Sequence, residues 1–153
     1  VERLGEAGWD DAVVGVGQPG RLVLEFTREA ADAGAAVRSA LADVRRAAPS
    51  AKLIEVAPDL VGLTDVAEIV GVSRQNMRKL MLAHPGSFPA PVHEGSASIW
   101  HLADVLTWLQ AKGSYPLAKD VLDVARVALQ VNVAKEGQRL PRSASKELQA
   151  LVG

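Results

Sequence analysis

The sequence predicts an α+β protein in which a small ββαβ module comes first, a helix-turn-helix with a following hairpin comes next, and a helical extension ends the chain. Three observations predict this order. Two runs rich in β-branched residues flank a Gly/Pro turn near the start, two short amphipathic segments meet at a glycine in the middle, and apolar residues at helical spacing fill the last third. We expect the parts to span residues 1–58, 59–112 and 113–153.

Composition narrows the class of protein. The chain has 153 residues, a formal net charge of −1 and no Cys. Without Cys, disulfide frameworks, thiolate zinc sites and cysteine nucleophiles are excluded. No apolar run approaches the roughly 18 residues that a membrane span needs. We therefore expect a cytoplasmic protein that has no membrane partner.

The N-terminal module begins with residues 1–10, which we expect to form a short helix or a loose arm. Strands are predicted at residues 12–16 and 21–26, because Gly and Pro at residues 17–20 form a turn signal between them. Gly15, Gly17 and Gly20 have the spacing of a G-x-G-x-x-G phosphate loop. A dinucleotide site needs a helix after that loop, and the sequence predicts a strand there, so we expect no cofactor.

A helix and a third strand complete the ββαβ module. Apolar residues recur at helical spacing through residues 30–48, Pro49 ends that helix, and residues 51–57 (AKLIEVA) have the composition of a strand. The module contains no His, no Cys and no paired carboxylates. Its expected role is to bind a protein partner, a small effector or a second copy of itself.

The central stretch predicts two short helices. Thr64 is the expected N-cap of the first, Gly71 ends it, and Ser73 caps a second helix over residues 74–82. Met77, Leu80 and Met81 would share the inward face of the second helix. Polar side chains would occupy the outward face, as in the recognition helix of a helix-turn-helix that enters a DNA major groove. The expected DNA-contacting residues of this segment are Ser73, Arg74, Gln75, Asn76, Arg78 and Lys79.

A short hairpin and a third helix follow. Residues 92–94 and 97–100 can pair around Gly95 and Ser96, after an extended, proline-containing entry. A hairpin in this position is a wing, so His93 and Ser96 are further candidates for contact with DNA. Apolar residues at helical spacing from Leu102 onward then predict the helix that closes the core, with Asp104 in its first turn.

These motifs, in this order, resemble the AlpA/excisionase group of winged helix-turn-helix proteins, small relatives of the MerR DNA-binding domain. The matching residues are Leu63, Val66, Ala67, Gly71, Val72, Ser73, Arg74, Phe88, Pro89, Pro91, Val92, Trp100, Asp104, Val105, Trp108 and Leu109. The match covers about a third of the chain. The resemblance implies that the second helix contacts the major groove and that the wing contacts the backbone or the minor groove. Gln75, Asn76 and Met77 depart from the family pattern, which often has a small and a β-branched residue there, and the ββαβ module is no part of it.

Charge along the chain limits the expected affinity for DNA. Residues 60–112 carry four Lys or Arg and four Asp or Glu, yet no acidic residue occurs from Arg74 to Phe88. The positive charge is therefore local, which favours one particular site over a general coating of DNA.

The C-terminal segment predicts a long helix over residues 117–135 and a short one over residues 143–151. The long helix has a broad apolar face that must be covered, either by the rest of the chain or by a second copy. A homodimer is attractive because two half-sites add contacts and specificity.

The leading hypothesis is a sequence-specific regulator of transcription that binds double-stranded DNA. One alternative is a protein-interaction adaptor or antitoxin-like subunit, and another is an excisionase-like factor that bends DNA for a recombinase. An enzyme is not expected, because the sequence shows no nucleophile-base pair and its three His are scattered without accompanying carboxylates.

Overall fold

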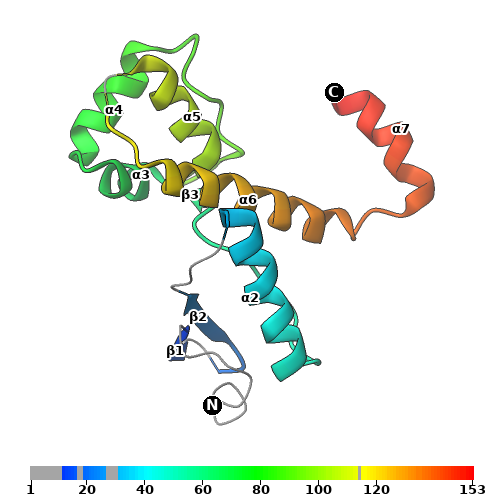
Figure 1. The fold of residues 1–153 in the computed structure, drawn as a ribbon. Helices are drawn as coiled ribbons and strands as arrows, with labels where there is room; N and C mark the ends of the chain where they lie inside the picture. Colours follow the sequence, from blue (N-terminus) through cyan, green and yellow to red (C-terminus); the bar gives the residue numbers. More distant parts are fainter. Residues whose placement is uncertain (1–11, 17–18, 27–30, 114) are drawn as a thin grey trace. The chain divides into compact units, whose positions relative to one another are not determined.

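The structure is a computed structural model that describes residues 12–16, 19–26, 31–113 and 115–153 (Figure 1). The arm or helix expected over residues 1–10 lies outside these residues. The chain divides into two compact units, Val1–Leu53 and Ile54–Gly153, and each is described by itself. Helices and short antiparallel strands make up the described part, so the predicted α+β class is confirmed.

The first unit contains the predicted hairpin. β1 (Ala12–Val16) and β2 (Leu22–Phe26) pair antiparallel along their whole length. Gly20 has a φ of +81°, in the left-handed region that glycine adopts without a Cβ penalty. Residues 17–18 of the predicted turn lie outside the described residues. A strand follows this glycine-containing loop, as predicted.

One helix follows the hairpin in this unit. α2 (Ala33–Ala47) begins at Asp32, whose carboxylate accepts a hydrogen bond of 2.7 Å from the Ala35 N–H. The predicted helix is confirmed, although it starts three residues later than residue 30. Asp32 explains the start, because its side chain satisfies a first-turn donor that would otherwise lack a partner.

The third strand of the predicted ββαβ module is not formed. Residues 51–57 contain no strand, and the hairpin sheet has two strands only among the described residues. The physical reason is that side chains of a later helix satisfy the polar backbone of this segment. Asn132 bonds both the N–H and the C=O of Val56, and Lys135 donates to the C=O of Ile54. A β-prone segment needs a strand as partner to become a strand, and here helix side chains take that place.

The second unit contains two helices joined by a tight turn. α3 (Leu63–Val70) ends at Gly71, which has a φ of +84°, and α4 (Arg74–Ala83) follows. The N-cap of α3 is Gly62, not Thr64 as predicted. The reason is that the Asp65 carboxylate accepts a 3.0 Å hydrogen bond from the Gly62 N–H, so the helix starts earlier in the chain, at Leu63.

A small three-stranded sheet supports these helices. β4 (His93–Glu94) and β5 (Ser98–His101) form the predicted hairpin, and β3 (Leu60–Val61) pairs with the other edge of β5. Both pairings are antiparallel. β3 was not predicted, since a two-residue strand is too short to show a period.

The core of this unit lies between α3, α4, β5 and α5 (Leu102–Lys112). Side chains with no exposed surface include Met77, Leu102, Val105, Leu106 and Leu109. The predicted spacing of apolar residues in α5 is therefore confirmed. These side chains fix the relative positions of the helices and the sheet.

Two further helices end the chain. The first half of α6 (Lys119–Gly137) packs on the core through Leu122 and Ala125, Ala128 is also buried, and the second half of the helix continues past the core (Figure 1). The apolar face expected on this helix is thus covered in part by the chain itself, and its other members are half-buried: Val121, Val124, Leu129 and Val131. α7 (Arg142–Val152) has no buried residue. Among the described residues, no helix combines the length and apolarity that crossing a membrane requires.

Candidate nucleic-acid interface

The candidate interface starts at the cap of α4. The Ser73 hydroxyl accepts a 3.1 Å hydrogen bond from the Asn76 N–H, so the predicted N-cap is confirmed. Just before it, the N–H groups of Gly71 and Val72 both donate to the C=O of Ala67 at 2.9 Å. These bonds close the turn between α3 and α4, so the first turn of α4 is held in a defined position.

α4 has two different faces. Met77 is completely buried and packs in the core, with Leu80 and Met81 half-buried beside it. The opposite face is exposed and carries cations and amides without an acidic residue. Its exposed polar members are Arg74, Gln75, Asn76, Arg78 and Lys79, and Leu82 is exposed as well. Asn76 is exposed like the others.

Helical spacing orders this exposed face. Arg74 and Arg78 are four residues apart, as are Gln75 and Lys79, so each pair lies one above the other along α4. The face therefore presents two parallel rows of hydrogen-bond donors. Such an array can bond phosphate oxygens or base edges.

The hairpin carries the other two predicted residues. His93 and Ser96 are both exposed, His93 on β4 and Ser96 in the loop between β4 and β5. Before the loop, the Val92 N–H donates to the C=O of Ile99 at 2.7 Å, which extends the pairing beyond β4. A Cβ added at Gly95 would lie 2.7 Å from Nε2 of His93, so the imidazole lies close over the loop backbone. The predicted site residues thus form two groups, one on α4 and its cap and one on the hairpin.

Aromatic side chains link the end of α4 to the hairpin. Trp100 is 4% exposed, and its Nε1–H donates to the C=O of Pro89 at 2.9 Å. Phe88 packs edge-on against Trp100, with ring centroids 5.9 Å apart, and against Trp108, at 5.1 Å. His84 adds a further edge-on contact to Trp108. The extended segment between α4 and β4 is therefore anchored to the core at both ends.

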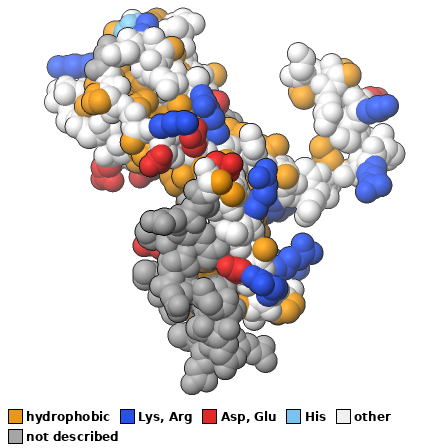
Figure 2. All heavy atoms as spheres, in the orientation of Figure 1, with side chains coloured by type: hydrophobic (Ala, Val, Ile, Leu, Met, Phe, Trp, Pro, Cys, Tyr) orange, Lys and Arg blue, Asp and Glu red, His pale blue; other side chains and the backbone are white. Residues whose placement is uncertain are grey.

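Charge on this unit is mixed. Basic and acidic side chains lie near one another on the face that Figure 2 shows, and they do not gather into one continuous patch. At the far end of α6, the hydrogen bond from Lys135 and the charge of Arg139 lower the pKa of the exposed Glu136 carboxyl. The acid-free face of α4 is therefore a local feature.

A second group of polar residues was not predicted from the sequence. Asp59 is 1% exposed, and its carboxylate accepts from the ring of His101 at 2.7 Å and from the Asn132 amide at 2.8 Å. Asp59 lies 42 residues before His101 and 73 residues before Asn132, so no local sequence pattern connects them. His101 was one of the three His set aside as too scattered. In the sequence, Asp59 is followed by the apolar residues Leu60 and Val61, which is only a weak signal of a buried carboxylate.

Comparison with protein-family models, with curated proteins and with solved structures finds no match to this chain.

Proposed function

We propose that this chain is a sequence-specific DNA-binding regulator of transcription in which α3, α4 and the β4–β5 hairpin act as a winged helix-turn-helix. One observation supports the proposal above the others. α4 buries Met77 completely and exposes an acid-free face of cations and amides on the other side. A short, rigidly held helix with such a face has the size and chemistry to enter a major groove.

The residue types on α4 suit different atoms of DNA. Arg74 and Arg78 can bond the O6 and N7 acceptors of guanine with two N–H groups each, and Lys79 suits a phosphate as a point charge. Gln75 and Asn76 can pair with the N6 and N7 edge of adenine. In this proposal Ser73 and the first N–H groups of α4 meet a phosphate, because a helix N-terminus favours an anion.

The hairpin would act as the wing. His93 and Ser96 are exposed near its tip, where they can contact the sugar-phosphate backbone or the minor groove. The anchored segment around Trp100 holds this hairpin in place relative to α4. Two contact regions held by one core would fix the register of the protein on DNA.

We also propose that two copies bind together. One ten-residue helix offers few base contacts, and two half-sites multiply them. The apolar face of α6 is covered only in part by the chain's own core, at Leu122 and Ala125. Sedimentation velocity with and without a selected DNA fragment would give the number of copies.

Selection of bound fragments from random double-stranded DNA, followed by fluorescence anisotropy, tests the function. We expect enrichment of one short motif and a Kd that weakens steeply as salt rises. The double variant Arg74→Ala/Arg78→Ala should lose on the order of 100-fold in affinity for that motif and discriminate less between sequences, whereas its salt dependence should change little because these two side chains contact bases in this proposal.

A matched control is Arg126→Ala, which removes an exposed cation from α6. This variant should bind as the wild type does. If the wild-type protein enriches no sequence and shows no salt-sensitive binding, the proposal fails, and the protein-interaction adaptor becomes the leading hypothesis. If both variants lose affinity equally, the contact is only nonspecific attraction of charge.

A further inference from the structure

The polar group around Asp59 lies outside the proposed DNA interface and outside the apolar core. The carboxylate is buried, and its two oxygens have separate partners, His101 on one side and Asn132 on the other. A carboxylate accepts hydrogen bonds, so Nδ1 of His101 is assigned as the donor. A buried polar group with each oxygen satisfied holds its partners in one geometry.

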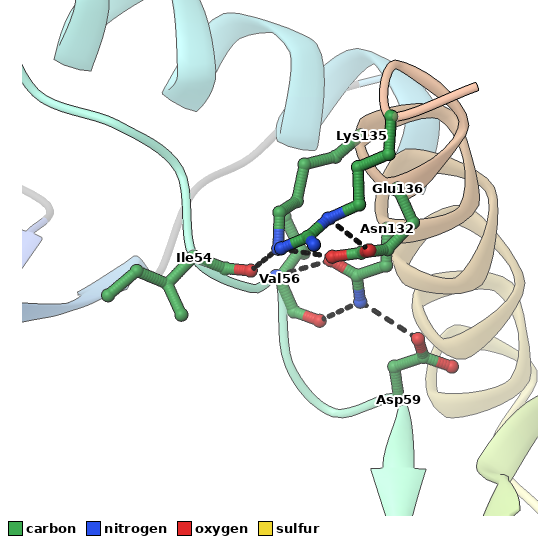
Figure 3. A network of polar contacts seen from close by, with 7 residues as sticks. Ile54, Val56, Asp59, Asn132, Lys135 and Glu136 are labelled. Carbon is green, nitrogen blue, oxygen red and sulfur yellow. Dashed lines mark hydrogen bonds and ion pairs between the residues drawn. The ribbon is translucent and has the colours of Figure 1, made fainter. Parts of the chain in front are cut away.

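Asn132 fixes the segment that follows the first unit. Its Oδ1 accepts from the Val56 N–H and its Nδ2 donates to the Val56 C=O, both at 2.8 Å, in the way that a neighbouring strand would (Figure 3). The same Nδ2 donates to Asp59. Three residues further along α6, Lys135 donates to the C=O of Ile54 at 2.6 Å. Residues 54–59 are thus held along α6 by side chains.

Asp59 continues this link into the sheet. Its C=O accepts a 2.7 Å hydrogen bond from the Leu102 N–H at the start of α5. The next residue, Leu60, pairs with His101 in β5, and β5 in turn pairs with β4. An unbroken series of hydrogen bonds therefore runs from Val56 through Asp59 to the hairpin.

We propose that Asn132 is a positioning residue for the hairpin: by holding Val56 and Asp59 together, it sets the placement of β5 and so of the wing. The consequence is that residues 54–58, the linker that follows the first unit, are energetically coupled to the DNA-binding hairpin. An event that pulls residues 54–58 away from α6 weakens DNA binding, and DNA binding strengthens the hold on the linker by the same factor. The DNA-binding part of this inference rests on the proposed function.

The test compares Asn132→Ala with Gln130→Ala, a variant of an exposed polar residue on the same helix that takes no part in these contacts. Three quantities are measured in the full chain: the ¹⁵N shifts of the His101 ring, hydrogen exchange at the N–H groups of Val56 and Leu102, and affinity for the selected DNA. We expect Asn132→Ala to shift the His101 signals, to speed exchange at both N–H groups at least tenfold, and to weaken binding about tenfold. Gln130→Ala should leave all three unchanged.

A second variant covers the case in which Asn132→Ala does not fold. Asp59→Asn keeps the shape of the side chain, but an amide has one acceptor oxygen whereas the carboxylate has two. It should therefore change the His101 signals and speed exchange at Leu102 in the same direction. Unchanged His101 signals and unchanged exchange in the folded variants would overturn the coupling.

The measurement of DNA affinity separates this inference from the proposed function. If the wild-type protein binds no DNA, the proposed function fails, whereas the ring shifts and exchange rates still decide whether Asn132 positions β5. If the wild-type protein binds DNA and Asn132→Ala changes hydrogen exchange but not DNA affinity, the coupling ends at β5, and the proposal that Asn132 positions the wing is wrong.

Discussion

Beneath α3, α4 and α5 the unit Ile54–Gly153 is held by apolar side chains, whereas at Asp59 it is held by hydrogen bonds between buried polar atoms. The apolar core places Met77 and Leu106 without any exposed surface. The polar junction joins Asp59, His101 and Asn132 at distances of 2.7–2.8 Å. The core supports the helix that we propose to contact DNA, and the junction connects the linker to the hairpin.

The difference lies in how specific each kind of contact is. Apolar packing is not directional, so many side chains of about the right volume can fill the same space. A buried hydrogen bond requires one donor and one acceptor in one geometry, and a lost partner leaves a buried group unsatisfied. The core should therefore respond to changes in volume, and the junction to changes of single atoms.

The largest effect is expected from Met77→Ala. Met77 is completely buried under α4, and removing its side chain leaves a cavity, so unfolding free energy should fall by about 2–5 kcal/mol. Urea denaturation followed by circular dichroism measures this change. Lys79→Ala, on the exposed face of the same helix, should change stability by less than about 0.5 kcal/mol. Equal losses in both variants would contradict the two-faced arrangement of α4.

A smaller loss is expected from Asp59→Ala. The substitution removes the acceptor of Nδ1 of His101 and one of the two acceptors of Nδ2 of Asn132, and the two losses together should cost about 2–4 kcal/mol. The control is Asp104→Ala, which removes an exposed carboxylate from the first turn of α5 and should cost less than about 1 kcal/mol. Chemical denaturation of both variants tests the comparison. A loss at Asp59 no greater than at Asp104 would mean that the junction contributes little to stability.

The same contrast explains which parts of the structure the sequence could predict. Helical spacing placed Met77 inside and Arg78 outside, because burial follows a period that adjacent residues share. The cap at Ser73 was predictable for a similar reason, since its partner, the Asn76 N–H, is three residues away.

The junction had no local signal. Asn132 and Val56 are 76 residues apart. The composition of residues 51–57 predicts a strand when only neighbouring residues are considered. In the structure the backbone of Val56 pairs instead with the side chain of Asn132, which lies far away in the sequence on α6. Long-range polar contacts of this kind leave composition and periodicity unchanged, so the predicted third strand is wrong and Asp59 is absent from the predicted site.

The smallest effect we predict concerns the backbone between α3 and α4. Gly71 has a φ of +84° with open space around the position of a Cβ, so Gly71→Ala should cost about 1–2 kcal/mol through backbone strain alone. Gly137, the last residue of α6, also has open space but no positive φ, and Gly137→Ala should stabilise the protein by about 0.5–1 kcal/mol. The thermal midpoints of the two variants should therefore move in opposite directions. A rise in both would show that the turn before α4 does not depend on the left-handed conformation, and α4 would then be held by Met77 and the core alone.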